Sequence, residues 1–456
     1  MFIGRDAELK DLEDLYSKPG LRSIAVYGRR RVGKTSLLAE FCEGKRAIFF
    51  SAREGNETIN LKAYSKALSE VGGIAWGSFD DYEDAMRATV EVCRGQKTVL
   101  VIDELPFITK ESGYFASTLQ HYMDHEFSRM DFMVIVCGSS IGMMDDILNG
   151  RQRPLFGRFS RQMELKPFDY LDSRKFMPDA DEKRCAETFG ITGGVPLYLR
   201  LMSEGTFKEA LIDNFLKPSS FLREEPLNIL RQEFANPSIY SSILSAMSDG
   251  KTRVSHISDA SGVEMSTCSK YISSMELLGI VRREAPMSNS KKRPVYEIAD
   301  GLFRFKYSVI DKVQMLIARR KEEEAYESVM RLMPNFMGER FETICRQFLS
   351  KSTRYGLIGK WWGNDPEMRT EAEIDIVAAD GVDLTANVLF GSCKYRSRPM
   401  DVRDLEELIR VSALVKGYRN RDYALFSLSG FDEDLVEVAK ERDVKLYTLG
   451  DLYRRR

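Results

Sequence analysis

The stretch of sequence that decides the fold consists of residues 23–27 (SIAVY), 28–35 (GRRRVGKT) and 36–44 (SLLAEFCEG). The β-branched run predicts a strand, and the last segment has the apolar spacing of a helix. Between them stands the pattern GxxxxGK[ST], whose glycines let the chain fold back so that backbone N–H groups and the helix N-terminus surround phosphates. The stretch therefore predicts a phosphate-binding loop of a nucleotide site.

Within this loop we expect Lys34 to reach the β- and γ-phosphates and Thr35 to ligate Mg²⁺. The complete set of residues expected to bind the nucleotide is Gly28, Arg31, Val32, Gly33, Lys34, Thr35, Ser36 and Asp103.

The carboxylates that such a site requires follow a second apolar strand. Residues 98–102 (TVLVI) lead directly into Asp103 and Glu104, and a continuous apolar run is typical of a strand buried in a parallel sheet. Phosphoryl transfer from ATP to water needs a carboxylate in the Mg²⁺ shell and a residue that orients or deprotonates the water. We expect Asp103, the Walker B residue, to fill the first role and Glu104 the second, as general base.

A third apolar strand, residues 132–137 (FMVIVC), ends in Gly138, Ser139 and Ser140. Ser139 or Ser140 fits a polar sensor of the γ-phosphate or of the water, and we place Ser139 in the catalytic set. With residues 47–51 (AIFFS) and 161–165 (RQMEL), five strands alternate with helices, which predicts an α/β core with a five-stranded parallel sheet. The sequence has no NKxD-like element that reads guanine, so ATP is favoured over GTP.

Six motifs of the chain occur in the order seen in archaeal-type ATPases. They are FIGRDAEL, the phosphate-binding loop, VLVIDE, CGSS, PLFGR and GGVPLYL. The chain thus resembles P-loop ATPases of the AAA+/STAND side. This resemblance implies that residues 2–5 line the adenine pocket, that Arg158 senses the γ-phosphate or acts as an arginine finger, and that Gly194 and Pro196 form a GxP turn. A surface role is the alternative for Arg158, because three other arginines flank it.

Composition and charge exclude several other classes of protein. The 456 residues suffice for two to four domains, and 67 basic against 69 acidic residues give a net charge of -2, which excludes nucleic-acid binding by bulk charge. The sequence has no apolar run long enough for a membrane anchor and a charged N-terminus unlike a signal peptide. Its seven scattered cysteines contain no CxxC pair and indicate reduced thiols in a cytoplasm.

After Pro237, three apolar-periodic helices are followed by two short strands, a pattern that resembles a winged helix. Residues 266–278 would form the recognition-type helix, and residues 288–294 (SNSKKRP) the wing loop. Five cations of the wing oppose only Glu284 and could grip phosphates: Arg282, Arg283, Lys291, Lys292 and Arg293. The alternative is a protein-binding or intramolecular role, because the helix carries only Lys270 against Glu264 and Glu276.

The C-terminal region contains carboxylates in strand-like alternation. In residues 371–375 (EAEID), Glu371, Glu373 and Asp375 share one face of the predicted strand, where clustered carboxylates attract a hard cation. A later strand delivers Ser392 and Lys394, and the lysine could stabilise developing phosphate charge.

This region resembles the PD-(D/E)xK nuclease fold. Under that resemblance Glu342 matches the helix glutamate, Asp375 the strand aspartate and Lys394 the lysine, so the possible nuclease site is Glu342, Glu373, Asp375 and Lys394. Ser392 stands where the family has an acidic residue, which removes a metal ligand. Three alternatives follow. Glu373 could replace the missing metal ligand, or the domain could be an inactive relative that binds nucleic acid or protein. In the third alternative, the resemblance to the nuclease fold is mistaken.

These patterns predict five segments: an ATPase core (1–170), a helical lid (171–235), a winged helix (236–300), a helical linker (301–335) and a restriction-endonuclease-like domain (336–456). The first hypothesis for function is a cytoplasmic, Mg²⁺-dependent ATPase that couples ATP to DNA binding or processing. The alternative is a STAND-type signalling switch whose C-terminal modules bind protein. Both allow a homo-oligomer, and neither involves a membrane.

Overall fold

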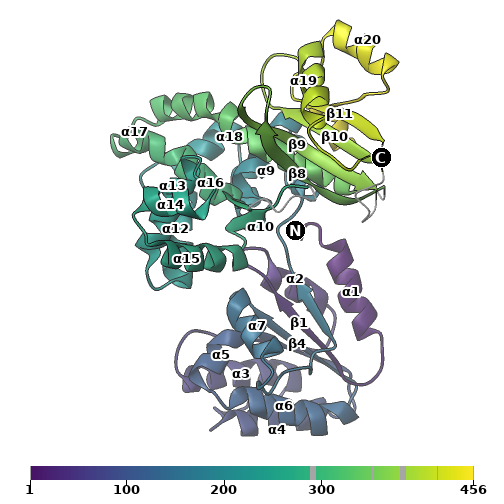
Figure 1. The fold of residues 1–456 in the computed structure, drawn as a ribbon. Coiled ribbons are helices and arrows are strands. Elements are labelled where there is room, and N and C mark those ends of the chain that lie inside the picture. The colour runs from purple at the N-terminus through teal and green to yellow at the C-terminus, as the bar shows by residue number, and fades with distance from the viewer. Residues whose placement is uncertain (1, 288–293, 352–353, 381–386, 419, 455–456) are drawn as a thin grey trace. The chain divides into compact units, whose positions relative to one another are not determined.

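The structure, a computed structural model, describes residues 2–287, 294–351, 354–380, 387–418 and 420–454 (Figure 1). The chain divides into two compact units, Met1–Pro167 and Phe168–Arg456. In the described ranges, no helix combines the length and the apolar character needed to cross a membrane. The seven cysteines, all within those ranges, are free thiols.

The first unit is built on one parallel sheet of five strands in the order β2-β3-β4-β1-β5. This confirms the predicted α/β class and the five-stranded parallel sheet. Strand β4 lies between β1, which precedes the phosphate-binding loop, and β3, which precedes Glu104. The strands are β1 Arg22–Tyr27, β2 Ala47–Ser51, β3 Thr98–Asp103, β4 Phe132–Gly138 and β5 Arg161–Glu164.

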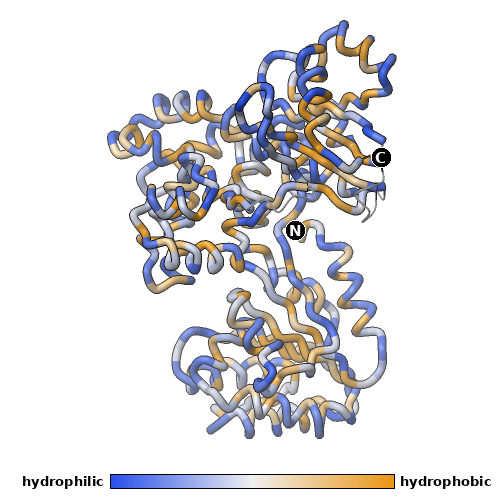
Figure 2. The backbone as a smooth tube through the Cα atoms, viewed as in Figure 1, coloured by the Kyte–Doolittle hydropathy of each residue, from blue (hydrophilic) through white to orange (hydrophobic). Residues whose placement is uncertain are grey.

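Helices cover both faces of this sheet because its strands are apolar on both faces. Along β1, Ile24 and Val26 pack into a core with α1 and α2, whereas Ala25 points into the core formed with α3 to α6. Figure 2 shows the resulting apolar segments in the strands of this unit. The helices are α1 Asp6–Tyr16, α2 Lys34–Cys42, α3 Glu57–Gly72, α4 Tyr82–Cys93, α5 Leu105–Glu111, α6 Phe115–His125 and α7 Ile141–Asn149.

The second unit contains a separate five-stranded sheet near the C-terminus, in the order β12-β11-β10-β9-β8. Strand β11 is parallel to both β10 and β12, whereas β9 is antiparallel to both β8 and β10. The strands are β8 Tyr355–Asp365, β9 Thr370–Asp380, β10 Val388–Lys394, β11 Arg421–Ser427 and β12 Lys445–Thr448.

One face of this second sheet packs on the long helix α18 Glu322–Ser350, with residues such as Ile376 and Phe426 in the shared core. The other face packs on α19 Val402–Ser412 and α20 Glu433–Glu441. Helix α18 is continuous through residue 335, where the sequence suggested a boundary between linker and C-terminal domain.

Short helices at the start of the second unit share the core of α18. They are α8 Tyr170–Arg174, α9 Glu182–Thr192, α10 Pro196–Ser203, α11 Phe207–Leu211 and α12 Phe221–Glu233, joined later by α16 Gly301–Ser308 and α17 Gln314–Ala318. The GxP turn leads into α10, whose first residue is Pro196. Gly194 has φ 78°, and a Cβ there would lie 1.9 Å from the Phe168 carbonyl oxygen, so the close approach requires glycine.

Between these helices lies a module of three helices and a hairpin, with its own apolar core. Its elements are α13 Pro237–Ser248, α14 Val254–Ser261, α15 Met265–Leu277, β6 Val281–Glu284 and β7 Val295–Ile298, and the two strands are antiparallel. We call residues 237–298 the hairpin module. The expected wing cations Lys291, Lys292 and Arg293 lie outside the described residues.

Candidate functional site

The phosphate-binding loop connects β1 to the N-terminus of α2. Gly28 has φ 152°, and a Cβ at this position would lie 2.4 Å from the Leu165 carbonyl oxygen, so the loop can pass β5 only with glycine. Gly33, with φ 90°, precedes α2 directly. The first N–H groups of α2 have no partner within the helix and can bind an anion.

Lys34 lies at the base of this loop and is 6% exposed. Its Nζ donates to the carbonyl oxygens of Gly28 at 2.8 Å and Arg29 at 3.0 Å. Burial lowers the pKa of Lys34, while the nearby Cys137, Glu104 and Asp103 oppose the decrease. Val32 is buried beside it, whereas Arg31, Thr35 and Ser36 are exposed.

Thr35 and Asp103 meet across the gap between α2 and β3. The Thr35 hydroxyl donates to Asp103 Oδ2 at 2.8 Å, and Asp103 is 2% exposed. A hydroxyl and a carboxylate oxygen in contact are the hard donors that Mg²⁺ prefers, so this pair fits the expected metal shell. Cys137 of β4 lies close to Asp103, and burial followed by the charge of Asp103 raises the pKa of its thiol, which stays protonated.

Glu104 and Ser139 are brought together from the ends of β3 and β4. Ser139 binds Glu104 Oε2 twice, through its backbone N–H at 3.1 Å and its hydroxyl at 2.9 Å. Glu104 itself has φ 57°, a left-handed conformation that side chains rarely adopt. Two hydrogen bonds and a strained backbone thus fix the position of this carboxylate beside the loop.

Arg5 supports the loop from the N-terminal segment. It is 8% exposed, and its guanidinium donates to the carbonyl oxygens of Val32 at 3.1 Å and Lys166 at 2.7 Å. It also pairs with Glu8 at 2.9 Å. Phe2 packs against the core of α1 and α2. The segment expected to line the adenine pocket therefore lies next to the phosphate-binding loop.

Arg158 lies away from the other expected catalytic residues. Its carbonyl accepts a hydrogen bond from Ser23 at the beginning of β1, and its guanidinium pairs with Asp124 of α6 at 2.9 Å. The loop follows the opposite end of β1, roughly 13 Å away at 3.3 Å per residue. Arg158 therefore lies at the end of β1 remote from the phosphate-binding loop of its own chain.

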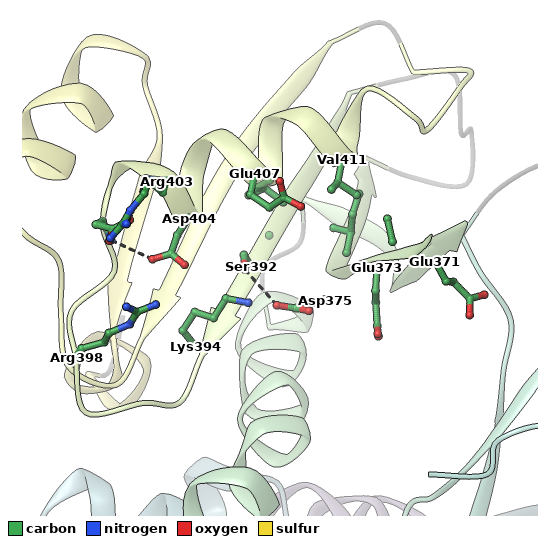
Figure 3. A pocket seen from close by; sticks show the side chains of 15 residues that line it. Glu371, Glu373, Asp375, Ser392, Lys394, Arg398, Arg403, Asp404, Glu407 and Val411 are labelled. Atoms are coloured by element: carbon green, nitrogen blue, oxygen red, sulfur yellow. Dashed lines mark hydrogen bonds and ion pairs between the residues drawn. The ribbon is translucent and has the colours of Figure 1, made fainter. Parts of the chain in front are cut away.

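Of the expected C-terminal residues, Glu373, Asp375 and Lys394 line a cavity of about 530 Å³ between β9, β10 and α19, whereas Glu342 does not (Figure 3). Asp375 accepts the backbone N–H of Cys393 at 2.7 Å and the hydroxyl of Ser392 at 3.3 Å. Lys394 extends toward these two side chains. The structure thus brings Asp375, Ser392 and Lys394 together, with the serine bonded to the aspartate.

Glu342 and Glu373 share a partner that the sequence did not indicate. Lys360 of β8 lies 2.9 Å from Glu342 and 3.4 Å from Glu373, and also 3.4 Å from Glu297 of β7. Burial, together with the repulsion of Asp375, raises the pKa of Glu342 to about 7. Burial opposes ionisation of Glu297 as well, but Lys360 and Arg282 lower its pKa to about 2.

In the described residues, neither the pair His121 and His125 nor the C-terminal carboxylates form a metal-binding site of three or more ligands. His121 and His125 have ring centroids 4.7 Å apart on the exposed side of α6. Across the described ranges, no group of three or more histidine, cysteine or acidic side chains is arranged to hold a metal ion.

Sequence reasoning missed two residues that shape these sites, Cys137 and Lys360, and it did not anticipate that Arg5 binds the phosphate-binding loop. Cys137 stands inside a motif that was interpreted for its serines. Lys360 left a detectable signal, because it is a single charged residue within the strand segment LIGKWWG (357–363), where charge is unexpected.

The parallel sheet, the loop between β1 and α2, and the carboxylates after β3 define a P-loop nucleotide-binding protein. Comparison with known proteins agrees. Residues 2–202 match the family described as an ATPase domain predominantly from Archaea, and residues 306–407 match a family of archaeal and bacterial proteins of unknown function.

Individual proteins are also similar to this chain. An uncharacterized protein of Methanocaldococcus jannaschii is 27% identical over 426 residues, which are 91% of this chain and 92% of the relative. An uncharacterized ATP-binding protein of the same organism is 46% identical over 46 residues, 10% of this chain and 78% of that protein. The solved Walker-type ATPase of Pyrococcus abyssi shares the fold with a TM-score of 0.53 and 17% identity, over 67% of this chain and 96% of its own.

The chain is therefore a P-loop ATPase, which binds and hydrolyses ATP.

Proposed function

We propose that this ATPase couples Mg²⁺-dependent ATP hydrolysis to DNA binding through the hairpin module. The observation that carries the proposal is the exposed face of α15, which follows two helices and precedes a hairpin as in a winged helix. This face presents hydroxyls and one lysine to solvent: Ser266, Ser269, Lys270 and Ser273. Such groups contact phosphates and base edges.

Glu264, the N-cap residue of α15, opposes DNA binding less than its charge suggests. Glu264 caps the helix N-terminus, where its carboxylate accepts the backbone N–H groups of Ser266 and Thr267 at 3.0 and 3.1 Å. The Ser266 hydroxyl, which donates to the same carboxylate, and these backbone bonds lower the pKa of Glu264 to about 2. The charge of Glu264 is thereby held at the N-terminus of the helix. Glu276 is exposed on the same face of α15 as Ser269 and Ser273, close to the C-terminal end of the helix, so its charge opposes DNA binding there.

At the ATP site, Thr35 and Asp103 would hold Mg²⁺, which would neutralise phosphate charge. In this proposal Lys34 binds the phosphates, Glu104 accepts a proton from the attacking water, and Ser139 positions Glu104. Cys137, kept neutral by burial, supports Asp103 without adding charge.

For the C-terminal domain we propose a PD-(D/E)xK-like fold that contacts DNA or protein without cutting. Supporting this, Ser392 takes the position of an acidic ligand, and Asp375 is held by the Ser392 hydroxyl and the Cys393 N–H. Glu342 and Glu373 are both paired with Lys360.

The DNA proposal is tested by fluorescence anisotropy with labelled duplex DNA over a range of salt concentrations. We expect affinity to fall steeply with salt, and Lys270→Ala to weaken binding at low salt and reduce the salt slope by about one phosphate contact. The matched control is Lys440→Ala, another exposed helix lysine, which should bind as wild type. Equal affinities and slopes in all three proteins would contradict a role for α15.

The second candidate function is a STAND-type switch in which the hairpin module binds within its own chain. It is favoured by Arg282, which pairs with Glu284 at 2.7 Å and Glu297 at 3.0 Å and is thereby committed to partners inside the module. In a switch, the rate of ATP hydrolysis would not change on addition of DNA. Binding of ATP would instead change the sensitivity of the chain to proteases.

Arg158 enters the proposal only across an interface between copies of the chain. Arg158 lies near the beginning of β1, far from the phosphate-binding loop of its own chain. In a catalytic role it would therefore contact the ATP bound to an adjacent subunit. This role requires a homo-oligomer, and a mixture with inactive Arg158→Ala subunits would then lose more activity than dilution alone explains.

A further inference from the structure

Lys360 is a buried lysine at the meeting point of three structural elements. It is 3% exposed, and its Nζ lies within 3.4 Å of three carboxylates. Glu297 comes from β7 of the hairpin module, Glu342 from α18 and Glu373 from β9 of the C-terminal sheet. These elements are separated in sequence, and this one ammonium group joins them.

The stability of the charged form of Lys360 depends on its three carboxylate partners, and theirs depends on Lys360. A buried ammonium group without a carboxylate partner is strongly destabilising, and so is a carboxylate that loses its only cation. Without Lys360, Glu297 would keep Arg282 at 3.0 Å and Glu342 would keep Arg346 at 3.9 Å, but no ammonium group would lie between the three carboxylates. A lysine supplied by the chain thus meets the same electrostatic need that a bound divalent cation meets in carboxylate sites.

The same residue also fixes the hairpin to the C-terminal sheet through its backbone. The Lys360 carbonyl accepts the backbone N–H of Met287 at 2.7 Å. The Met287 side chain fills the space beside Gly359, where a Cβ would lie 2.6 Å from Met287 Cγ. A second ion pair, Arg253 to Glu371 at 3.5 Å, joins the module to β9.

We propose that Lys360 is the resident cation of the C-terminal carboxylate cluster, supplied by the protein in place of a divalent metal ion. It thereby couples the hairpin module to the C-terminal sheet. Glu342 and Glu373 are then committed to an internal ion pair, so the cluster binds neither Mg²⁺ nor Mn²⁺. This inference does not depend on DNA binding, because its readouts are metal binding and thermal stability.

The test uses the full chain with Asp103→Asn, which removes the expected metal ligand of the ATP site. Electron paramagnetic resonance of added Mn²⁺ should detect no bound ion in this protein, and Mn²⁺ should leave its melting temperature unchanged. Adding Lys360→Met should lower the melting temperature and create a Mn²⁺ site, so that Mn²⁺ now raises the melting temperature by several degrees.

The matched control is Lys306→Met in the same background, because Lys306 is also a buried lysine but pairs with a single carboxylate of the described residues, that of Asp311. It should be destabilised without gaining Mn²⁺ binding. If the Lys360→Met chain fails to fold, the double variant Lys360→Met, Glu342→Gln should regain stability, because it removes one of the repelling charges.

Stoichiometric Mn²⁺ binding by the Lys360-containing chain that is lost on Glu342→Gln would overturn the proposal. A folded Lys360→Met chain that neither loses stability nor binds Mn²⁺ would overturn it as well.

Discussion

Glu104→Gln is expected to retain ATP binding while its hydrolysis rate falls about 10²–10⁴-fold, the range for loss of a general base. The amide has nearly the same size as the carboxylate and can still contact Ser139, which lies 2.9 Å from Glu104 through its hydroxyl. It cannot accept a proton from water at neutral pH. Equilibrium binding of a labelled ATP analogue and steady-state phosphate release measure the two properties separately.

Ser139→Ala is the comparison variant for this experiment. It removes one of the two hydrogen bonds to Glu104 and keeps the backbone N–H at 3.1 Å, so its rate should lie between wild type and Glu104→Gln. A loss of roughly 10- to 150-fold corresponds to one hydrogen bond to a charged group, worth about 1.5–3 kcal/mol. Normal turnover by Glu104→Gln would remove Glu104 as the base.

Lys34→Ala is expected to weaken ATP binding about 10²–10⁴-fold, because charge-assisted bonds to phosphate contribute roughly 1.5–3 kcal/mol each. The buried ammonium group lies 2.8 Å from the Gly28 carbonyl inside the loop, where solvent cannot replace it. Isothermal titration with ATP and Mg²⁺ measures the affinity, and phosphate release should fall to background.

Two controls separate lost binding from a collapsed loop. The melting temperature of Lys34→Ala without nucleotide should stay near that of wild type if the loop remains folded. Lys34→Arg keeps the positive charge and should bind ATP more tightly than Lys34→Ala. Unchanged ATP affinity in Lys34→Ala would contradict the assignment of the phosphate site.

The sequence predicted the ATPase core well because its signals are local. Strands β3 and β4 are apolar runs followed by the expected functional residues, so Asp103, Glu104 and Ser139 could be placed together at one edge. The hydrogen bonds between Ser139 and Glu104 are the direct result of β4 pairing with β3.

The same local signals could not place residues whose roles depend on long-range contacts. Arg158 stands in a plausible motif, but pairing of β5 with β1 sets it at the far end of the sheet. Lys360 and its three carboxylates come from four separate elements, so their contact depends on the packing of the hairpin module against the C-terminal sheet.

The measurement that tests the central claim most directly is the steady-state rate of ATP hydrolysis with and without duplex DNA at low salt. Glu104→Gln serves to subtract contaminating activity. Coupling through α15 predicts that DNA changes the wild-type rate several-fold, and that Lys270→Ala needs more DNA for the same change. A rate that DNA leaves unchanged, under conditions in which ATP is hydrolysed, would contradict coupling to DNA and favour the switch.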